Sequence, residues 1–145
     1  MHILDQKNDI TLSSKTDIYK DVRYTVTDKF EMSIGNFSEP ARLLLEKYSA
    51  TCGVFVTAWN HYGQFMSESE NEFNTLCLVN ALESSGVVYF DGVGVSRDGN
   101  WSEKSLFVIE PTGSFLLSMF TEYKQNTYVK IENTGMVELI FNPFL

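Results

Sequence analysis

Two carboxylates, two amides and two indole rings are the side chains of this sequence best placed to do chemistry. They occur at the ends of segments expected to form strands or at the start of an expected helix. The six residues are Trp59, Asn60, Glu70, Asn71, Trp101 and Glu103. Carboxylates and amides fix the orientation of a polar or cationic ligand, and the flat faces of tryptophan attract rings and amines. We therefore predict a small-molecule-binding pocket formed by these residues.

The carboxylates also permit two other kinds of chemistry. Glu70 and Glu103 could act as the acid and base of a hydrolase. Together with Asn60 and Asp91 they could instead hold a hard cation such as Mg²⁺ through oxygen ligands. Most surface carboxylates only remain solvated, so binding is the favoured interpretation. Whether the protein is an enzyme stays open, and we predict no cofactor and no dedicated metal site.

A nucleophilic active site is less well supported. Serine and cysteine nucleophiles need a nearby histidine, and the sequence has only His2 and His61. Cys52 precedes an expected strand and Cys77 lies inside an expected helix, so neither has the exposed, electropositive setting of a reactive thiolate. A pairing of His61 with either cysteine stays open, but we expect both cysteines to be buried free thiols.

The segment from Gly53 to Trp59 positions the first two site residues. It is an almost unbroken apolar run, which favours an interior strand with neighbours on both sides over an edge strand with one wet face. Asn60 then stands at the carboxyl end of this strand. Because open α/β sheets bind ligands at the carboxyl edge, we expect the pocket at that end.

A helix is predicted from about residue 67 to residue 85, and its first turn positions two more site residues. Ser67 and Glu70 fit the S-x-x-E capping box, in which the serine accepts from a backbone N–H and the glutamate reaches back to the cap. At 100° per residue, Glu70 shares a side with Asn74, and we expect this side to face inward. Asn71 lies about 100° away and is expected to reach back to the turn after Asn60.

Past its cap, the same helix carries apolar residues around most of its circumference, which predicts that it packs on a sheet and is covered again. Its first turn carries Glu68, Glu70 and Glu72. A helix N-terminus attracts anions, but three negative charges there oppose one. A ligand at this end should therefore be neutral and polar, cationic, or accompanied by a metal ion.

The remaining elements complete one domain over residues 19–145, with residues 1–18 as an N-terminal extension. The sequence predicts strands at 22–27 (continuing through 30–34), 87–90 and 105–110, helices at about 38–49 and 111–126, a loop or bulge at 91–94, and a closing hairpin over 127–141. The order is β-α-β-α-β-β-α-β-β. This order predicts an α+β fold with a mixed β-sheet, about three packed helices and right-handed crossovers between the first parallel strands.

Five short motifs occur in a fixed order along the chain: VFVTAWN, SESEN, DGVG, WSEKS and the QN at 125–126. In this order they resemble an uncharacterised bacterial family known only as domain of unknown function 3293. The resemblance extends over roughly residues 19–141. It departs from the family at His61, which stands where the family usually has proline. The resemblance supports the fold and the location of a site, and it implies no established activity.

Charge is distributed unevenly. Residues 1–50 carry seven Lys and Arg against eight Asp and Glu, and residues 51–145 carry four against eleven, which together give the net −8. Such a surface repels nucleic acid, so no direct nucleic-acid binding is expected. An acidic surface is complementary in charge to a basic surface on a partner protein. The alternative function is therefore an acidic interaction module of the inhibitor, immunity or anti-defence type, including a nucleic-acid mimic. Without a secretion signal or a long apolar stretch, we predict a cytoplasmic protein with no membrane partner.

Overall fold

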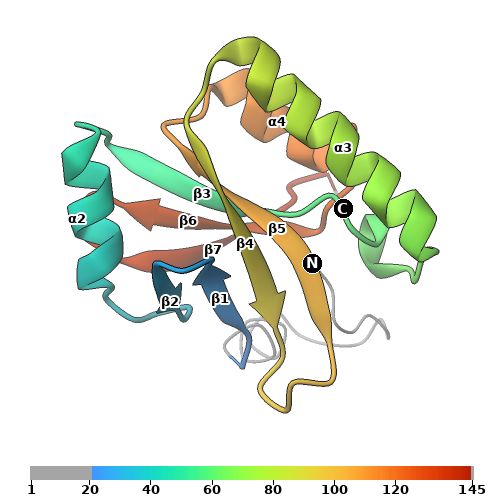
Figure 1. The fold of residues 1–145 in the computed structure, drawn as a ribbon, viewed down its shortest axis with the longest axis horizontal. Helices are drawn as coiled ribbons and strands as arrows, with labels where there is room; N and C mark the ends of the chain where they lie inside the picture. Colours follow the sequence, from blue (N-terminus) through green and yellow to red (C-terminus); the bar gives the residue numbers. More distant parts are fainter. Residues whose placement is uncertain (1–20, 145) are drawn as a thin grey trace.

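The computed structural model describes residues 21–144, which form one α+β domain built on a seven-stranded sheet (Figure 1). The N-terminal extension predicted for residues 1–18 lies outside these described residues. The strand order across the sheet is β2-β1-β4-β5-β3-β6-β7. In chain order the elements are β1 Arg23–Val26, β2 Phe30–Met32, α2 Glu39–Lys47, β3 Cys52–Val56, the 3₁₀ turn η1 His61–Gly63, α3 Glu68–Ser85, β4 Tyr89–Val95, β5 Ser102–Ile109, α4 Gly113–Thr121, β6 Thr127–Glu132 and β7 Val137–Phe141.

The α+β class is confirmed, but the expected parallel strands and right-handed crossovers are wrong. Each neighbouring pair in the described sheet is antiparallel. Strand β3 lies between β5 and β6, which follow it in the chain, and the helical connections before and after it lead to strands that are not its neighbours. The apolar content of a strand indicates that it is buried, but it does not indicate whether the neighbouring strands run parallel or antiparallel to it.

Strand β3 is an interior strand, as predicted. It pairs with β5 through Gly53 to Val56 and with β6 through Cys52 to Phe55, and the run from Gly53 to Ala58 is buried. An apolar strand in this position leaves no unpaired backbone edge and places both of its faces in the core.

The two faces of the sheet are covered by different helices (Figure 1). On one face, Ala41 and Leu45 of α2 belong to the same buried cluster as Phe55 and Phe107. On the other face, α3 and α4 contribute to a second cluster around Val54, Val56 and Val108; these helix residues are Leu78, Leu82, Met119 and Phe120. Alternation along β3 therefore sends successive side chains into the two clusters.

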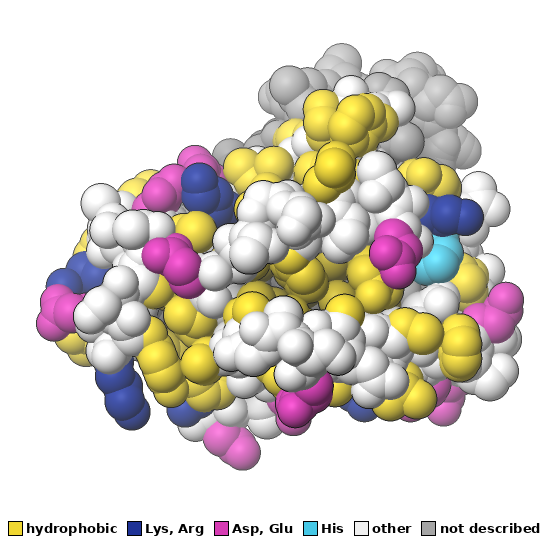
Figure 2. Space-filling model, turned by 90° about the horizontal axis from the view of Figure 1, so that it is seen from above, with side chains coloured by type: hydrophobic (Ala, Val, Ile, Leu, Met, Phe, Trp, Pro, Cys, Tyr) yellow, Lys and Arg dark blue, Asp and Glu magenta, His cyan; other side chains and the backbone are white. Residues whose placement is uncertain are grey.

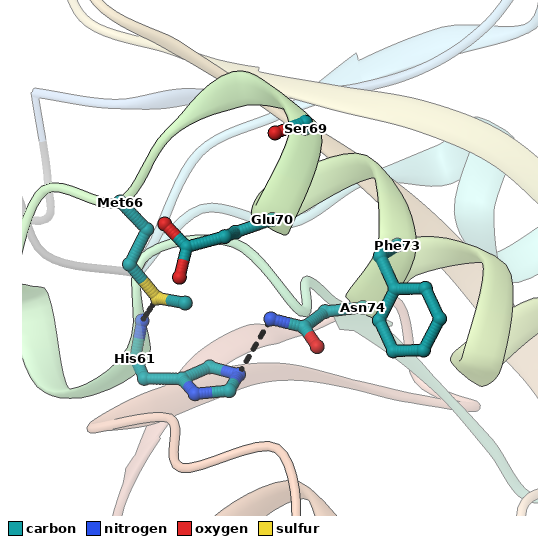
Figure 3. Close-up of a pocket in the computed structure, with 6 residues that line it drawn as sticks. All are labelled: His61, Met66, Ser69, Glu70, Phe73 and Asn74. Atoms are coloured by element: carbon teal, nitrogen blue, oxygen red, sulfur yellow. Dashed lines mark hydrogen bonds between the residues drawn. The ribbon is translucent and has the colours of Figure 1, made fainter.

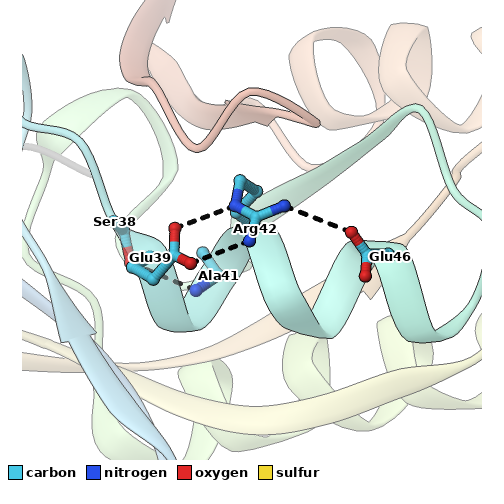
Figure 4. Close-up of polar contacts among 5 residues, drawn as sticks. All are labelled: Ser38, Glu39, Ala41, Arg42 and Glu46. Atoms are coloured by element: carbon cyan, nitrogen blue, oxygen red, sulfur yellow. Dashed lines mark hydrogen bonds and ion pairs between the residues drawn. The ribbon is translucent and has the colours of Figure 1, made fainter.

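Helix α2 forms where the sequence predicts it, because its start and its surface both favour a helix (Figure 4). Ser38 caps it, and its Oγ accepts from the backbone N–H of Ala41 at 3.2 Å. On the exposed side, the Arg42 guanidinium bonds Glu39 at 2.8 Å and Glu46 at 3.2 Å. Surface pairs of this kind contribute little, about 0.3–0.5 kcal/mol each.

Helix α3 differs from the prediction on its outer side. Its inward residues are Asn71, Thr75, Leu78 and Leu82. The prediction that the helix is covered on both sides is wrong, because Phe73 is 65% exposed and Leu76 is 56% exposed. These two side chains project away from the buried row, and within residues 21–144 no further layer covers them.

Two expectations about loops are also revised. The segment Asp91–Gly94, predicted as a loop or bulge, lies inside β4, although the expected close approach of backbone is present at Gly92. The helix predicted for about 111–126 is shorter than expected, because α4 ends at Thr121 and Lys124 beyond it is left-handed, with φ 51°. In the described part of the chain, no helix is both long enough and apolar enough to cross a membrane.

The capping box at the start of α3 gives a first prediction. The Ser67 Oγ accepts from the Glu70 N–H at 3.1 Å, and the Ser67 N–H donates to Glu70 Oε1 at 3.2 Å. Ser67→Ala is therefore expected to lower the free energy of unfolding by about 1 kcal/mol in urea denaturation. Ser84→Ala, on the exposed outer side of the same helix, is the matched control and should leave the midpoint unchanged or slightly higher. Equal midpoints for both variants would mean that the cap does not stabilise the helix.

Candidate functional site

The end of strand β3 is fixed by a buried asparagine in an unusual backbone conformation. Asn60 has φ 48°, in the left-handed region, where asparagine is among the better tolerated residues. Its side chain is buried, and all of its polar groups are used. Oδ1 accepts from the Met66 N–H at 3.0 Å and from Asn71 Nδ2 at 3.0 Å, while Nδ2 donates to Glu103 Oε2 at 3.1 Å.

Asn71 ties the first turn of α3 to this strand end, as the sequence predicted. Its Oδ1 accepts from the Asn60 backbone N–H at 2.8 Å, and its Nδ2 also donates to the Met66 carbonyl at 3.3 Å. The side chain is 2% exposed. The amide of Asn71 thus bonds Asn60 at the start of the turn and Met66 at its end, and these bonds hold the conformation of residues 60–66.

Glu103 completes what we term the strand-end network, formed by Asn60, Asn71 and Glu103. It lies in the second position of β5, and the antiparallel pairing of β5 with β3 brings it near the segment that follows β3, where it meets Asn60. The residue is fully buried. Burial raises the pKa of its carboxyl group above the usual range, and the hydrogen bond from Asn60 opposes this rise.

Gln125 supports the same strand end from the other side, a role that was not predicted from the sequence. Its Nε2 donates to the Trp59 carbonyl at 2.9 Å and to the Tyr123 carbonyl at 3.1 Å, and the residue is 1% exposed. Gln125 precedes β6, the second neighbour of β3. Its only signal in the sequence was the QN motif, which was interpreted as the end of a helix.

An open pocket of about 340 Å³ lies next to the strand-end network, between η1 and the first two turns of α3 (Figure 3). Ligand pockets typically measure about 300–1,000 Å³. Its lining combines an imidazole, a carboxylate, an amide, a hydroxyl, a thioether and a phenyl ring. These side chains belong to His61, Glu70, Asn74, Ser69, Met66 and Phe73.

His61 is held as a neutral ring with a defined tautomer. Its Nε2 lies 3.2 Å from Asn74 Nδ2. An amide nitrogen only donates, so Nε2 is the acceptor and the ring proton is on Nδ1. Desolvation lowers the pKa of His61, the charge of Lys124 lowers it further, and the carboxylate of Glu70 opposes both. At neutral pH the imidazole therefore offers one donor and one filled acceptor.

Glu70 supplies the negative charge of the pocket. Hydrogen bonds from the Ser67 hydroxyl and backbone lower the pKa of its carboxyl group, which is ionised at neutral pH. The expectation that Glu70 faces inward is wrong, because its side chain is exposed on the flank of α3. The inward row of the helix starts at Asn71, one residue along. Both bonds from Ser67 go to Oε1, and within residues 21–144 no hydrogen bond reaches Oε2.

The six predicted site residues therefore do not meet in one place. Asn60, Asn71 and Glu103 meet in the buried network, and Glu70 lines the pocket. Trp101 packs against the cluster on the α2 face of the sheet, away from the pocket. Trp59 is partly buried and its indole Nε1 is enclosed with no hydrogen-bond partner among the described residues.

This arrangement bears on the alternative chemistries. Glu103 is not among the residues that line the pocket, and it is buried behind Asn60, so the two glutamates do not share one cavity. Within residues 21–144, no group of three or more His, Cys, Asp or Glu side chains could hold a metal ion. Neither cysteine lines the pocket, and burial, together with the charge of Glu110, raises the pKa of Cys52.

Five lining residues were not among the predicted site residues: His61, Met66, Ser69, Phe73 and Asn74. Two of them had a signal in the sequence. Asn74 follows Glu70 by one helical turn on the same side, and His61 directly follows Asn60. The other three depend on the path of the chain between η1 and α3.

The strand-end network, Gln125 and the pocket all fall within one stretch of sequence. Residues 56–127 match the model of a family described as "Protein of unknown function (DUF3293)". The chain resembles DUF3293. The DUF3293 match runs from the last residue of β3 to the first residue of β6, so it contains each of these site residues. No curated protein and no solved structure matches the chain.

Proposed function

We propose that this protein is a small-molecule-binding module that takes a small organic cation, such as an amine, in the pocket between η1 and α3. The observation that carries the proposal is the lining of the pocket. A single ionised carboxylate, a neutral imidazole and an amide surround about 340 Å³ next to an exposed phenyl ring. A few polar groups that converge on one concave site, with apolar surface beside them, are typical of small-molecule sites.

The charged residues at the pocket favour a ligand with a positive charge. Glu70 is ionised, and no lysine or arginine lines the pocket in the described part of the chain. Glu68 and Glu72 flank it on the same helix turn and add negative potential. Lys124 influences the pKa of His61 but does not line the pocket. Phe73 offers a ring face to a cation, an interaction of about 0.5–1 kcal/mol at an exposed site.

The buried network supports this function because it fixes both walls of the pocket. Asn60 and Asn71 join the residue before η1 to the first turn of α3, and Asn60 also holds the Met66 backbone. His61 comes from the first wall and Glu70 from the second. A site whose walls are fixed in advance loses less conformational entropy when a ligand binds.

A second prediction tests the proposal by thermal shift with a panel of primary, secondary and quaternary amines. At one hundred times its dissociation constant, an amine should stabilise the parent protein by about 2.7 kcal/mol. Glu70→Gln should abolish this response, because glutamine keeps the capping box but removes the charge. Glu68→Gln removes the same charge from the same helix turn, without changing the pocket lining, and is the matched control.

The variants separate specific binding from a general attraction of cations to an acidic surface. Retention of the shift in Glu68→Gln and its loss in Glu70→Gln would support the pocket. A parent protein that no amine stabilises would overturn the proposal. Equal responses of the two variants would also overturn it, because the amine would then bind elsewhere on the surface.

A further inference from the structure

The outer side of α3 is an exposed apolar surface. Phe73 and Leu76 lie one turn apart and are 65% and 56% exposed, and Phe65, just before the helix, is 91% exposed. Figure 2 shows the face that carries α3 and α4, with apolar side chains exposed on it. Single exposed apolar residues are common, but three on one helix and its leading loop mark a contact surface.

Acidic side chains run along one flank of this apolar stripe. At 100° per residue, Glu68, Glu72 and Glu83 lie on the same side of α3, next to Leu76 and opposite the flank that carries Glu70. All three are exposed. Glu72 and Glu83 are about 16 Å apart along the helix axis. Between Lys47 and Arg97 the sequence contains no Lys or Arg, so α3 itself supplies no positive charge to balance these carboxylates.

We propose that the outer side of α3 docks a basic amphipathic helix of another protein. The apolar face of that helix covers Phe73 and Leu76, and its Lys and Arg side chains lie against Glu72 and Glu83. This is helix packing through apolar anchors, with charge complementarity setting the orientation. A second copy of the chain is a poorer occupant, because two copies of this face bring like charges together.

The docking surface and the pocket share Phe73, and the other residues of the two sites differ. Leu76 and Glu72 do not line the pocket, whereas Glu70, His61 and Asn74 do. Variants at Leu76 and Glu72 should therefore keep the stabilisation by amines described above. The two proposals can fail independently.

A third prediction tests this surface by fluorescence anisotropy. The probe is a labelled peptide of about 18 residues with leucine on one helical face and lysine on the other, a length at which a helix forms readily on binding. Leu76→Ser and Glu72→Lys should each weaken its binding by about tenfold. The matched controls are Leu43→Ser, an exposed leucine of α2, and Glu138→Lys, which makes the same change in net charge on β7.

Both controls should bind the peptide as the parent does, and a version of the peptide with glutamate in place of lysine should not bind. Loss of affinity in Leu76→Ser and Glu72→Lys alone would support docking on α3. Absence of binding to the lysine peptide would overturn the proposal. A similar loss in Glu72→Lys and Glu138→Lys would also overturn it, because the attraction would then depend on net charge and not on this surface.

Discussion

Asn71→Ala is expected to lower the free energy of unfolding by about 3 kcal/mol, because it leaves several buried groups without partners. The Asn60 backbone N–H loses its acceptor at 2.8 Å, and the Met66 carbonyl loses a donor at 3.3 Å. Asn60 Oδ1 loses one of its two donors. Each unsatisfied buried group costs about 1–3 kcal/mol, and water that enters the space recovers part of the loss.

Urea denaturation followed by circular dichroism measures this effect. Asn80→Ala is the matched control, since Asn80 is an exposed residue of the same helix, and alanine there should be neutral or slightly stabilising. Asn71→Asp keeps an acceptor for the Asn60 N–H but buries a carboxylate against Asn60 Oδ1 and the Met66 carbonyl, so it should be at least as unstable as Asn71→Ala. If Asn71→Ala and Asn80→Ala unfold at the same denaturant concentration, the strand-end network does not stabilise the fold.

Gly92→Ala is expected to lower the free energy of unfolding by about 2 kcal/mol through overpacking. Gly92 is buried in β4 and pairs with Val26 of β1. A Cβ atom there would lie 2.8 Å from the Thr25 carbonyl oxygen and 2.8 Å from Cε2 of Phe55. The phenyl ring can turn slightly, but the carbonyl belongs to the backbone of a paired strand, so β1 and β4 must move apart.

Gly113→Ala is the control for this substitution. Gly113 opens α4, and a Cβ added there meets no atom within 4 Å. Alanine in place of glycine in a helix should raise stability by about 0.4–1 kcal/mol, because the unfolded chain with alanine has less conformational entropy to lose on folding. The two variants should therefore shift the unfolding midpoint in opposite directions. A Gly92→Ala protein as stable as the parent would show that the sheet relaxes around this position at little cost.

The sequence by itself determined the local elements and one long-range contact. The capping residues Ser38 and Ser67 define where α2 and α3 begin, since these hydroxyls satisfy N–H groups that each helix leaves open. The apolar run after Cys52 fixed β3 as an interior strand. The prediction that Asn71 reaches the turn after Asn60 also held, because the helix starts only a few residues beyond that turn and its geometry leaves few options.

The tertiary structure decided which side chains meet. Antiparallel pairing placed Glu103 on one side of the β3 end and Gln125 on the other, and hydrophobic patterning is the same for either strand direction. Likewise, helical periodicity gave the relative angles of Glu70 and Asn71 but not the rotation of α3 on the sheet. That rotation is set by the packing of Leu78 and Leu82, and it turned Glu70 to the pocket and Asn71 to the core. The spacing of residues determines the relative directions of side chains on one helix or strand. The packing of that element against its neighbours determines which of those side chains face the core, the pocket or the solvent.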